Sequence, residues 1–136
     1  MKKIFVLLFC FVASLGMNAQ NIIGAWEGYH TSETGEKLKN VVIIADGYQV
    51  VSTYDAKTGK FVQTNGGTWK LEGNTMTEKV EFDTVTPERV GTEVSFEVKI
   101  TDTTMEIVGS SLKLTRIDDG TPGKLQGAWL MSGRVR

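Results

Sequence analysis

The chain has 136 residues, with 15 lysine and arginine side chains against 16 aspartate and glutamate side chains, and a formal net charge of −1. This balance offers no basic patch for a phosphate backbone or an anionic lipid surface, so nucleic acid is not an expected partner. The chain contains one histidine and one cysteine, too few for the usual ligand set of a zinc site, and neither a metal nor a cofactor is expected.

The N-terminus has the pattern of a signal peptide. Lys2 and Lys3 precede an apolar run over residues 4–15, and a short polar stretch ends at Ala19. We expect residues 1–19 to be removed after Ala19 and the mature chain to be secreted or periplasmic. The apolar run is shorter than the roughly 20 residues of a membrane-spanning helix, so no transmembrane anchor is expected.

The mature chain must be stabilised without disulfides, because Cys10 lies inside the apolar run. The bulky Phe9 before it argues against a lipid-attachment site. Removing Lys2 and Lys3 leaves 13 basic against 16 acidic side chains. About 117 residues remain, which is the length of one ordinary domain.

From Ile22 onward, short β-branched or aromatic runs alternate with Gly, Asn and Asp, and no window has sustained helical periodicity. The first strand is predicted over residues 22–31, with His30 at a solvated rim. Residues 41–45 and 48–51 form a predicted hairpin around Asp46-Gly47, since Asp-Gly suits a type I′ turn.

The strand over residues 41–44 is apolar on both faces, which predicts that one face is covered by a loop, a terminus or another protein. The contacting face would be either Val41 with Ile43 or Val42 with Ile44.

Six further strands are predicted, over residues 60–64, 68–72, 75–82, 93–100, 104–108 and 112–117. Turn-forming strings separate them. An all-β, up-and-down antiparallel β-barrel of about 8–10 short strands, occupying residues 20–117, accounts for this pattern.

Alternation of polar and apolar residues predicts which side chains face the barrel interior. Val94, Phe96, Val98 and Ile100 share one face, and Met76, Glu78, Val80 and Phe82 share another. Glu78 is therefore a carboxylate among apolar neighbours. It either orients a ligand or, with greater weight, pairs with a cation or lies in solvent at the strand end.

The last part of the chain repeats the beginning. Residues 118–124 have the composition of a linker, and Gly127-Ala128-Trp129 then repeats Gly24-Ala25-Trp26. Residues 125–136 are predicted either to open a second repeat or to add a strand to the first barrel.

Three motifs resemble those of lipocalin-like (calycin) proteins, particularly the small secreted domains of Bacteroidetes. They are Gly24-Ala25-Trp26, Gly67-Thr68-Trp69 and Thr115-Arg116-Ile117-Asp118. The resemblance implies that Trp26 packs across the barrel floor with Arg116 over its ring, a structural pair that closes the barrel.

The resemblance also implies a binding domain for a small apolar ligand held inside the barrel. The candidate ligand-binding residues are Tyr48, Tyr54, Trp69, Glu78 and Phe96. One alternative is a filled barrel that contacts proteins or polysaccharide through its outer face. A second is an isomerase, as some calycins are, which requires Glu78 and another titratable side chain in the cavity. With a single histidine no Ser-His-Asp arrangement can be assembled, so an enzyme is not expected.

Overall fold

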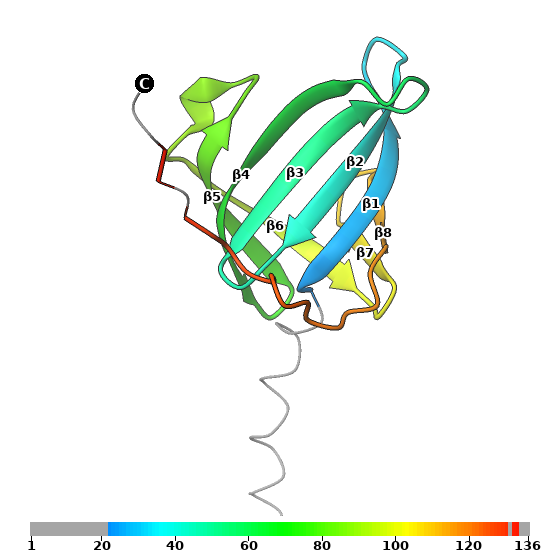
Figure 1. Ribbon diagram of the computed structural model, residues 1–136. Helices are drawn as coiled ribbons and strands as arrows, with labels where there is room; N and C mark the ends of the chain where they lie inside the picture. Colours follow the sequence, from blue (N-terminus) through cyan, green and yellow to red (C-terminus); the bar gives the residue numbers. More distant parts are fainter. Residues whose placement is uncertain (1–21, 131, 134–136) are drawn as a thin grey trace, which may run out of the picture.

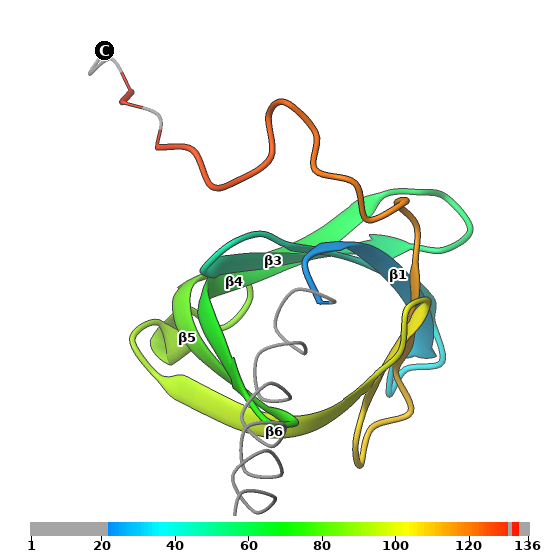
Figure 2. The same cartoon turned by 90° about the horizontal axis from the view of Figure 1, so that it is seen from below.

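The computed structural model describes residues 22–130, 132 and 133, and these form a closed antiparallel barrel (Figures 1 and 2). Each strand pairs with the next along the chain, and the last pairs with the first. The strands are β1 (Gly24–Thr31), β2 (Lys37–Ile44), β3 (Tyr48–Asp55), β4 (Phe61–Glu72), β5 (Thr75–Asp83), β6 (Glu93–Ile100), β7 (Thr104–Ile107) and β8 (Lys113–Arg116). A 3-10 helix, η1 (Pro87–Arg89), follows β5. The predicted all-β, up-and-down barrel is confirmed.

The predicted signal peptide, residues 1–19, lies outside the described residues. Within the described part of the chain, no helix combines the length and the apolar character that crossing a membrane requires.

β4 is one long strand, although the sequence predicts two strands separated by a turn at Asn65-Gly66-Gly67. The two glycines serve close backbone packing. A Cβ on Gly66 would lie 2.5 Å from the Gln49 carbonyl oxygen, and one on Gly67 would overlap the Lys79 carbonyl oxygen. The β4–β5 register shifts between Gly66 and Gly67, so the glycines accommodate a β-bulge and do not end the strand.

Trp26 forms the floor of the barrel, the end at which β1 begins. Its side chain is fully buried, and its indole N–H donates a 2.9 Å hydrogen bond to the Ile22 carbonyl. Around it lies a buried apolar cluster of Ile22, Val42, Ile44, Met76, Val98, Met105 and Leu114. The core is therefore concentrated at one end of the barrel.

Arg116 closes the floor from the outside. Its guanidinium carbon lies 4.2 Å from the centroid of the Trp26 ring. Nη1 donates to the Ile23 carbonyl at 3.0 Å, and Nε donates to the Asp102 carbonyl at 2.9 Å. The guanidinium thus combines a cation–π contact with hydrogen bonds to loop carbonyls, and ties both chain ends of the barrel together.

After β8 the chain crosses the outside of the barrel, past β1, β2 and β3 (Figures 1 and 2). Residues 118–130 contain no strand, so this described segment adds no strand to the barrel. That residues 125–136 open a second repeat remains a prediction.

The second Gly-Ala-Trp shares two local features with the first, although only the first lies in a strand. The Trp129 indole N–H donates to the Leu125 carbonyl at 2.9 Å, again four residues back. Gly127 has φ of 117°, in the left-handed range like Gly24 at 146°. The environments differ, because Trp129 is 71% exposed whereas Trp26 is fully buried.

Candidate ligand site in the barrel interior

The register of the strands assigns the inward-facing residues. Residues directly opposite each other in an antiparallel pair share a face. One inward row runs Trp26, Val42, Val51 and Asn65, and the next runs Gly28, Asn40, Thr53 and Gln63. The interior therefore changes from apolar at the floor to polar toward the opposite end, which we call the mouth. The β1–β2, β3–β4 and β5–β6 connections lie at the mouth (Figure 1).

A chain of three side chains crosses β1, β2 and β3 on the mouth side. The Thr53 hydroxyl donates to Asn40 Oδ1 at 2.8 Å, and Asn40 Nδ2 lies 2.7 Å from His30 Nδ1. Because Oδ1 accepts from Thr53, Nδ2 is the amide group that faces His30. His30 belongs to β1 and is half-buried, so the prediction of a solvated rim residue is wrong. The hydrogen bond to the buried Asn40 accounts for its position.

The opposite wall carries aromatic and aliphatic side chains that stay partly exposed. Trp69, Glu78 and Val94 are neighbours in register, and Phe96 lies opposite Met76. Val94 is 36% exposed although it faces inward, and Trp69 and Phe96 are half-buried. The predicted residues Trp69, Glu78 and Phe96 therefore share one wall of the interior.

Trp69 is held rigidly at this wall. Its indole N–H donates to the Ala45 carbonyl at 2.8 Å and lies 3.2 Å from the Tyr48 carbonyl, both beside the β2–β3 turn. The ring is thus fixed in orientation before any ligand enters.

Gln49 and Glu78 are the two polar side chains that stand out on the inward face. Gln49 is 6% exposed, and its Oε1 is buried with no hydrogen-bond partner among the described residues. It faces inward in the row of Ile44, Gln49, Gly67 and Val80. Glu78 is half-buried; burial raises the pKa of its carboxyl, and the positive charge of Arg89 lowers it in part. A buried unpaired acceptor is costly, so Gln49 marks the interior as a candidate site.

Asp83 has a structural role at the mouth. Its carboxylate accepts hydrogen bonds from the backbone N–H groups of Thr86 and Val85, which hold its pKa below the ordinary range. Arg89, in η1, lies 3.2 Å from the same carboxylate. Asp83 is therefore committed to holding this loop.

Tyr48 and Tyr54 face away from the interior. Alternate residues of β3, namely Gln49, Val51 and Thr53, face inward, so the two tyrosines lie on the outer face. Tyr48 is 45% exposed, and the Tyr54 ring lies edge-on to Phe61 with centroids 6.0 Å apart. Neither can orient a ligand inside the barrel. Gln49 is the inward polar residue that sequence reasoning missed, because alternation alone does not say which face of β3 is the inner one.

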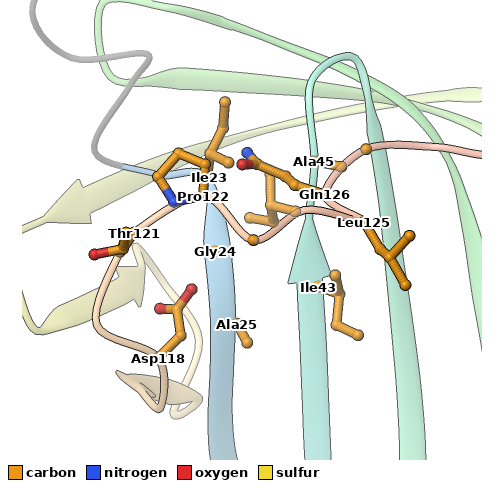
Figure 3. Close-up of a pocket in the computed structure, with 14 residues that line it drawn as sticks. Ile23, Gly24, Ala25, Ile43, Ala45, Asp118, Thr121, Pro122, Leu125 and Gln126 are labelled. Atoms are coloured by element: carbon orange, nitrogen blue, oxygen red, sulfur yellow. The ribbon is translucent and has the colours of Figure 1, made fainter.

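The outer face carries an apolar row that the chain end partly covers. In register, this row is Ala25, Ile43, Val50, Gly66 and Phe82. A pocket of about 230 Å³ lies between β1–β2 and the crossing segment, and Leu125 and Gln126 line it together with Ile43 and Ala45 (Figure 3). Of the two faces predicted for contact, Val42 and Ile44 are buried inside, and Ile43 is 50% exposed outside.

The charge on Glu78 is expected to make stability depend on pH. A carboxyl whose pKa is raised by folding stabilises the folded state below its ordinary value of 4.5 and loses that contribution as pH rises through the raised pKa. Urea unfolding between about pH 4 and pH 8 should show Glu78→Gln gaining stability over the wild type as pH increases. The exposed Glu81→Gln variant is the control. A difference that stays constant with pH would contradict the burial of Glu78.

Within the part of the chain that the structure describes, no three His, Cys, Asp or Glu side chains are grouped to hold a metal ion. No protein-family model matches the chain, and neither does any curated protein.

Among solved structures, the chain is similar to a lipocalin-like protein from Bacteroides uniformis. The two are 15% identical with a TM-score of 0.48, over 71% of this chain and 99% of that one. It is also similar to an uncharacterized protein from Bacteroides eggerthii, with 16% identity and a TM-score of 0.47, over 69% of this chain and 98% of that one. The fold class itself rests on the closed strand pairing described above.

Proposed function

We propose that this barrel is a binding domain that takes a small, largely apolar molecule into its interior, in a secreted or periplasmic protein. The observation that carries the proposal is the partial exposure of the inward apolar wall. In a closed barrel that is filled by its own side chains, Trp69, Val94 and Phe96 would be buried by their neighbours. Instead Val94 is 36% exposed, and Trp69 and Phe96 are half-buried.

Burial of this wall by a ligand would provide the binding energy. Each square ångström of apolar surface removed from water contributes about 25 cal/mol. The fixed indole of Trp69 and the buried floor around Trp26 are formed before binding, so little ordering is required of the protein. Polar groups in the interior would then set the orientation of the ligand.

Filling the interior near the mouth is expected to abolish binding. We expect the neutral fluorescent probe N-phenyl-1-naphthylamine to bind the wild type, and Val94→Trp to weaken that binding by at least about tenfold, the loss of about 1.4 kcal/mol. Val94, on β6, is paired with Glu78 on β5 and faces inward. Fluorescence titration is the measurement.

Ser95→Trp is the matched control, because Ser95 is the next residue of β6, is exposed and faces outward. It adds the same ring without entering the interior, so probe affinity should not change. Absence of probe binding to the wild type, or equal losses in both variants, would contradict the proposal.

A second candidate function is protein interaction through the outer face. The specific observation is that Leu125, Trp129 and Leu130 are 71–101% exposed, and that Leu125 lines a pocket with Ile43 of the apolar outer row. Exposed apolar groups gathered in one region mark contact surfaces. This candidate is favoured over the first if the probe fails to bind while Trp129→Ala abolishes self-association or partner binding in sedimentation velocity.

A further inference from the structure

The outer face of the barrel has a second pocket beside the one in Figure 3. It has a volume of about 230 Å³ and is lined by Ile43, Val50 and Phe82 of the apolar outer row and by Gly127 and Ala128 of the chain end. We call this second pocket the outer groove. Gly127 has no side chain and Ala128 has one methyl group, so the chain end crosses the groove without filling it.

The chain end also carries large apolar side chains that nothing in the described chain covers. Trp129 is 71% exposed and Leu130 is 101% exposed, and the end of this segment leads away from the barrel (Figure 2). The Trp129 indole N–H donates to the Leu125 carbonyl, and Trp129 does not line the groove of its own copy. Exposed apolar side chains of this size mark a contact surface.

We infer that two copies of this chain pair through this face, with Trp129 of each copy in the outer groove of the other. The inference names the partner for the outer-face contact given above as the second candidate function, and it rests on that candidate. Ala128 lines the groove and Trp129 is the next residue, so the groove and the ring lie close together on one molecule. A surface that carries both can satisfy both by pairing with itself about a two-fold axis.

The lining of the outer groove suits an indole ring. Tyr48 and Phe82 both line it, and they are 45% and 41% exposed. Aromatic rings pack favourably against one another. An apolar cavity of about 150 Å³ is large enough for a benzene ring, so a groove of about 230 Å³ has room for the larger indole.

A reciprocal contact supplies the area that a stable dimer requires. A tryptophan side chain buries about 150–250 Å², and Leu130 beside it is fully exposed. Two such chain ends and the two grooves that receive them together bury on the order of 1,000 Å², the lower limit for a specific interface. One chain end in a groove of a different protein would bury only about half of that area. Pairing with a second copy is therefore favoured over one-sided docking.

Sedimentation velocity over a series of protein concentrations tests the pairing. We expect the wild type to form a dimer that dissociates on dilution, and Trp129→Ala and Ile43→Asp each to weaken dimerisation by at least about tenfold, as loss of a central contact residue does. Val62→Asp is the matched control, because Val62 is 46% exposed on β4 and lies outside the groove. It should dimerise like the wild type.

A monomeric wild type, or an equal loss of dimer in Val62→Asp, would overturn the inference. The second candidate function would still stand if a different protein bound the monomer and Trp129→Ala abolished that binding. Binding of N-phenyl-1-naphthylamine measures the interior site separately, so its outcome does not depend on the dimer.

A mixture of the two impaired variants tests whether the ring and the groove contact each other. Trp129→Ala keeps the groove and Ile43→Asp keeps the ring, so an equimolar mixture can form one of the two contacts. We expect native mass spectrometry to show more of the mixed dimer than of either variant's own dimer. Equal amounts of all three would overturn the inference. Dimerisation of Ile43→Asp alone would mean that the rings contact each other, and dimerisation of Trp129→Ala alone would mean that the grooves do; either result would also overturn it.

Discussion

Replacing Trp26 with alanine is expected to destabilise the barrel by about 3–5 kcal/mol, the usual loss for a fully buried tryptophan. The substitution removes the floor, the hydrogen bond to the Ile22 carbonyl and the ring beneath Arg116. The Arg116 side chain is 12% exposed, so its charge would lie over a void. Urea unfolding followed by circular dichroism measures the loss. Most small domains have only about 5–15 kcal/mol of stability, so partial unfolding at room temperature is within the expected range.

Trp129→Ala is the matched control, because it alters the second copy of the same tripeptide. Trp129 is 71% exposed. Its indole N–H donates to the Leu125 carbonyl, which belongs to the same segment. Surface substitutions usually change stability by less than about 0.5 kcal/mol. A loss for Trp129→Ala that approaches the loss for Trp26→Ala would mean that the C-terminal segment is an integral part of the barrel.

The repeated tripeptide shows where sequence reasoning stops. In both copies the indole N–H donates to the carbonyl four residues back. The contacts that bury Trp26 also include residues distant in sequence, such as Arg116 over its ring. A repeat in sequence therefore predicts a local conformation, and its burial depends on the strands that follow it.

The barrel was predictable because the signals for its strands and turns lie within short stretches of sequence. Alternation of polar and apolar residues predicted β6, and the Asp-Gly turn predicted the hairpin of β2 and β3. The division of β4 into two strands failed because glycines in a strand and glycines in a turn look alike in sequence. Only the close approach of the Gln49 and Lys79 carbonyls shows which use applies.

The site was only partly predictable for a related reason. Glu78 stood out because its neighbours at alternate positions are apolar. Tyr48 and Tyr54 were chosen for their chemistry, but the register of β3 directs them outward and Gln49 inward. Which face of a strand is interior depends on how its partners pair, and a strand that is apolar on both sides carries little of that information.

Replacing Gly67 with alanine is expected to cost about 1–3 kcal/mol, the range for overpacking a filled position. The new Cβ would overlap the Lys79 carbonyl oxygen, which is backbone, so β5 must move relative to β4. We therefore expect a lower urea midpoint, measured by circular dichroism.

Gly123→Ala is the matched control. It adds the same methyl group where no atom lies within 4 Å of the new Cβ and φ is not positive, so stability should remain unchanged. If Gly67→Ala is as stable as Gly123→Ala, the close approach of β5 to Gly67 does not require glycine, and the bulge between β4 and β5 has another cause.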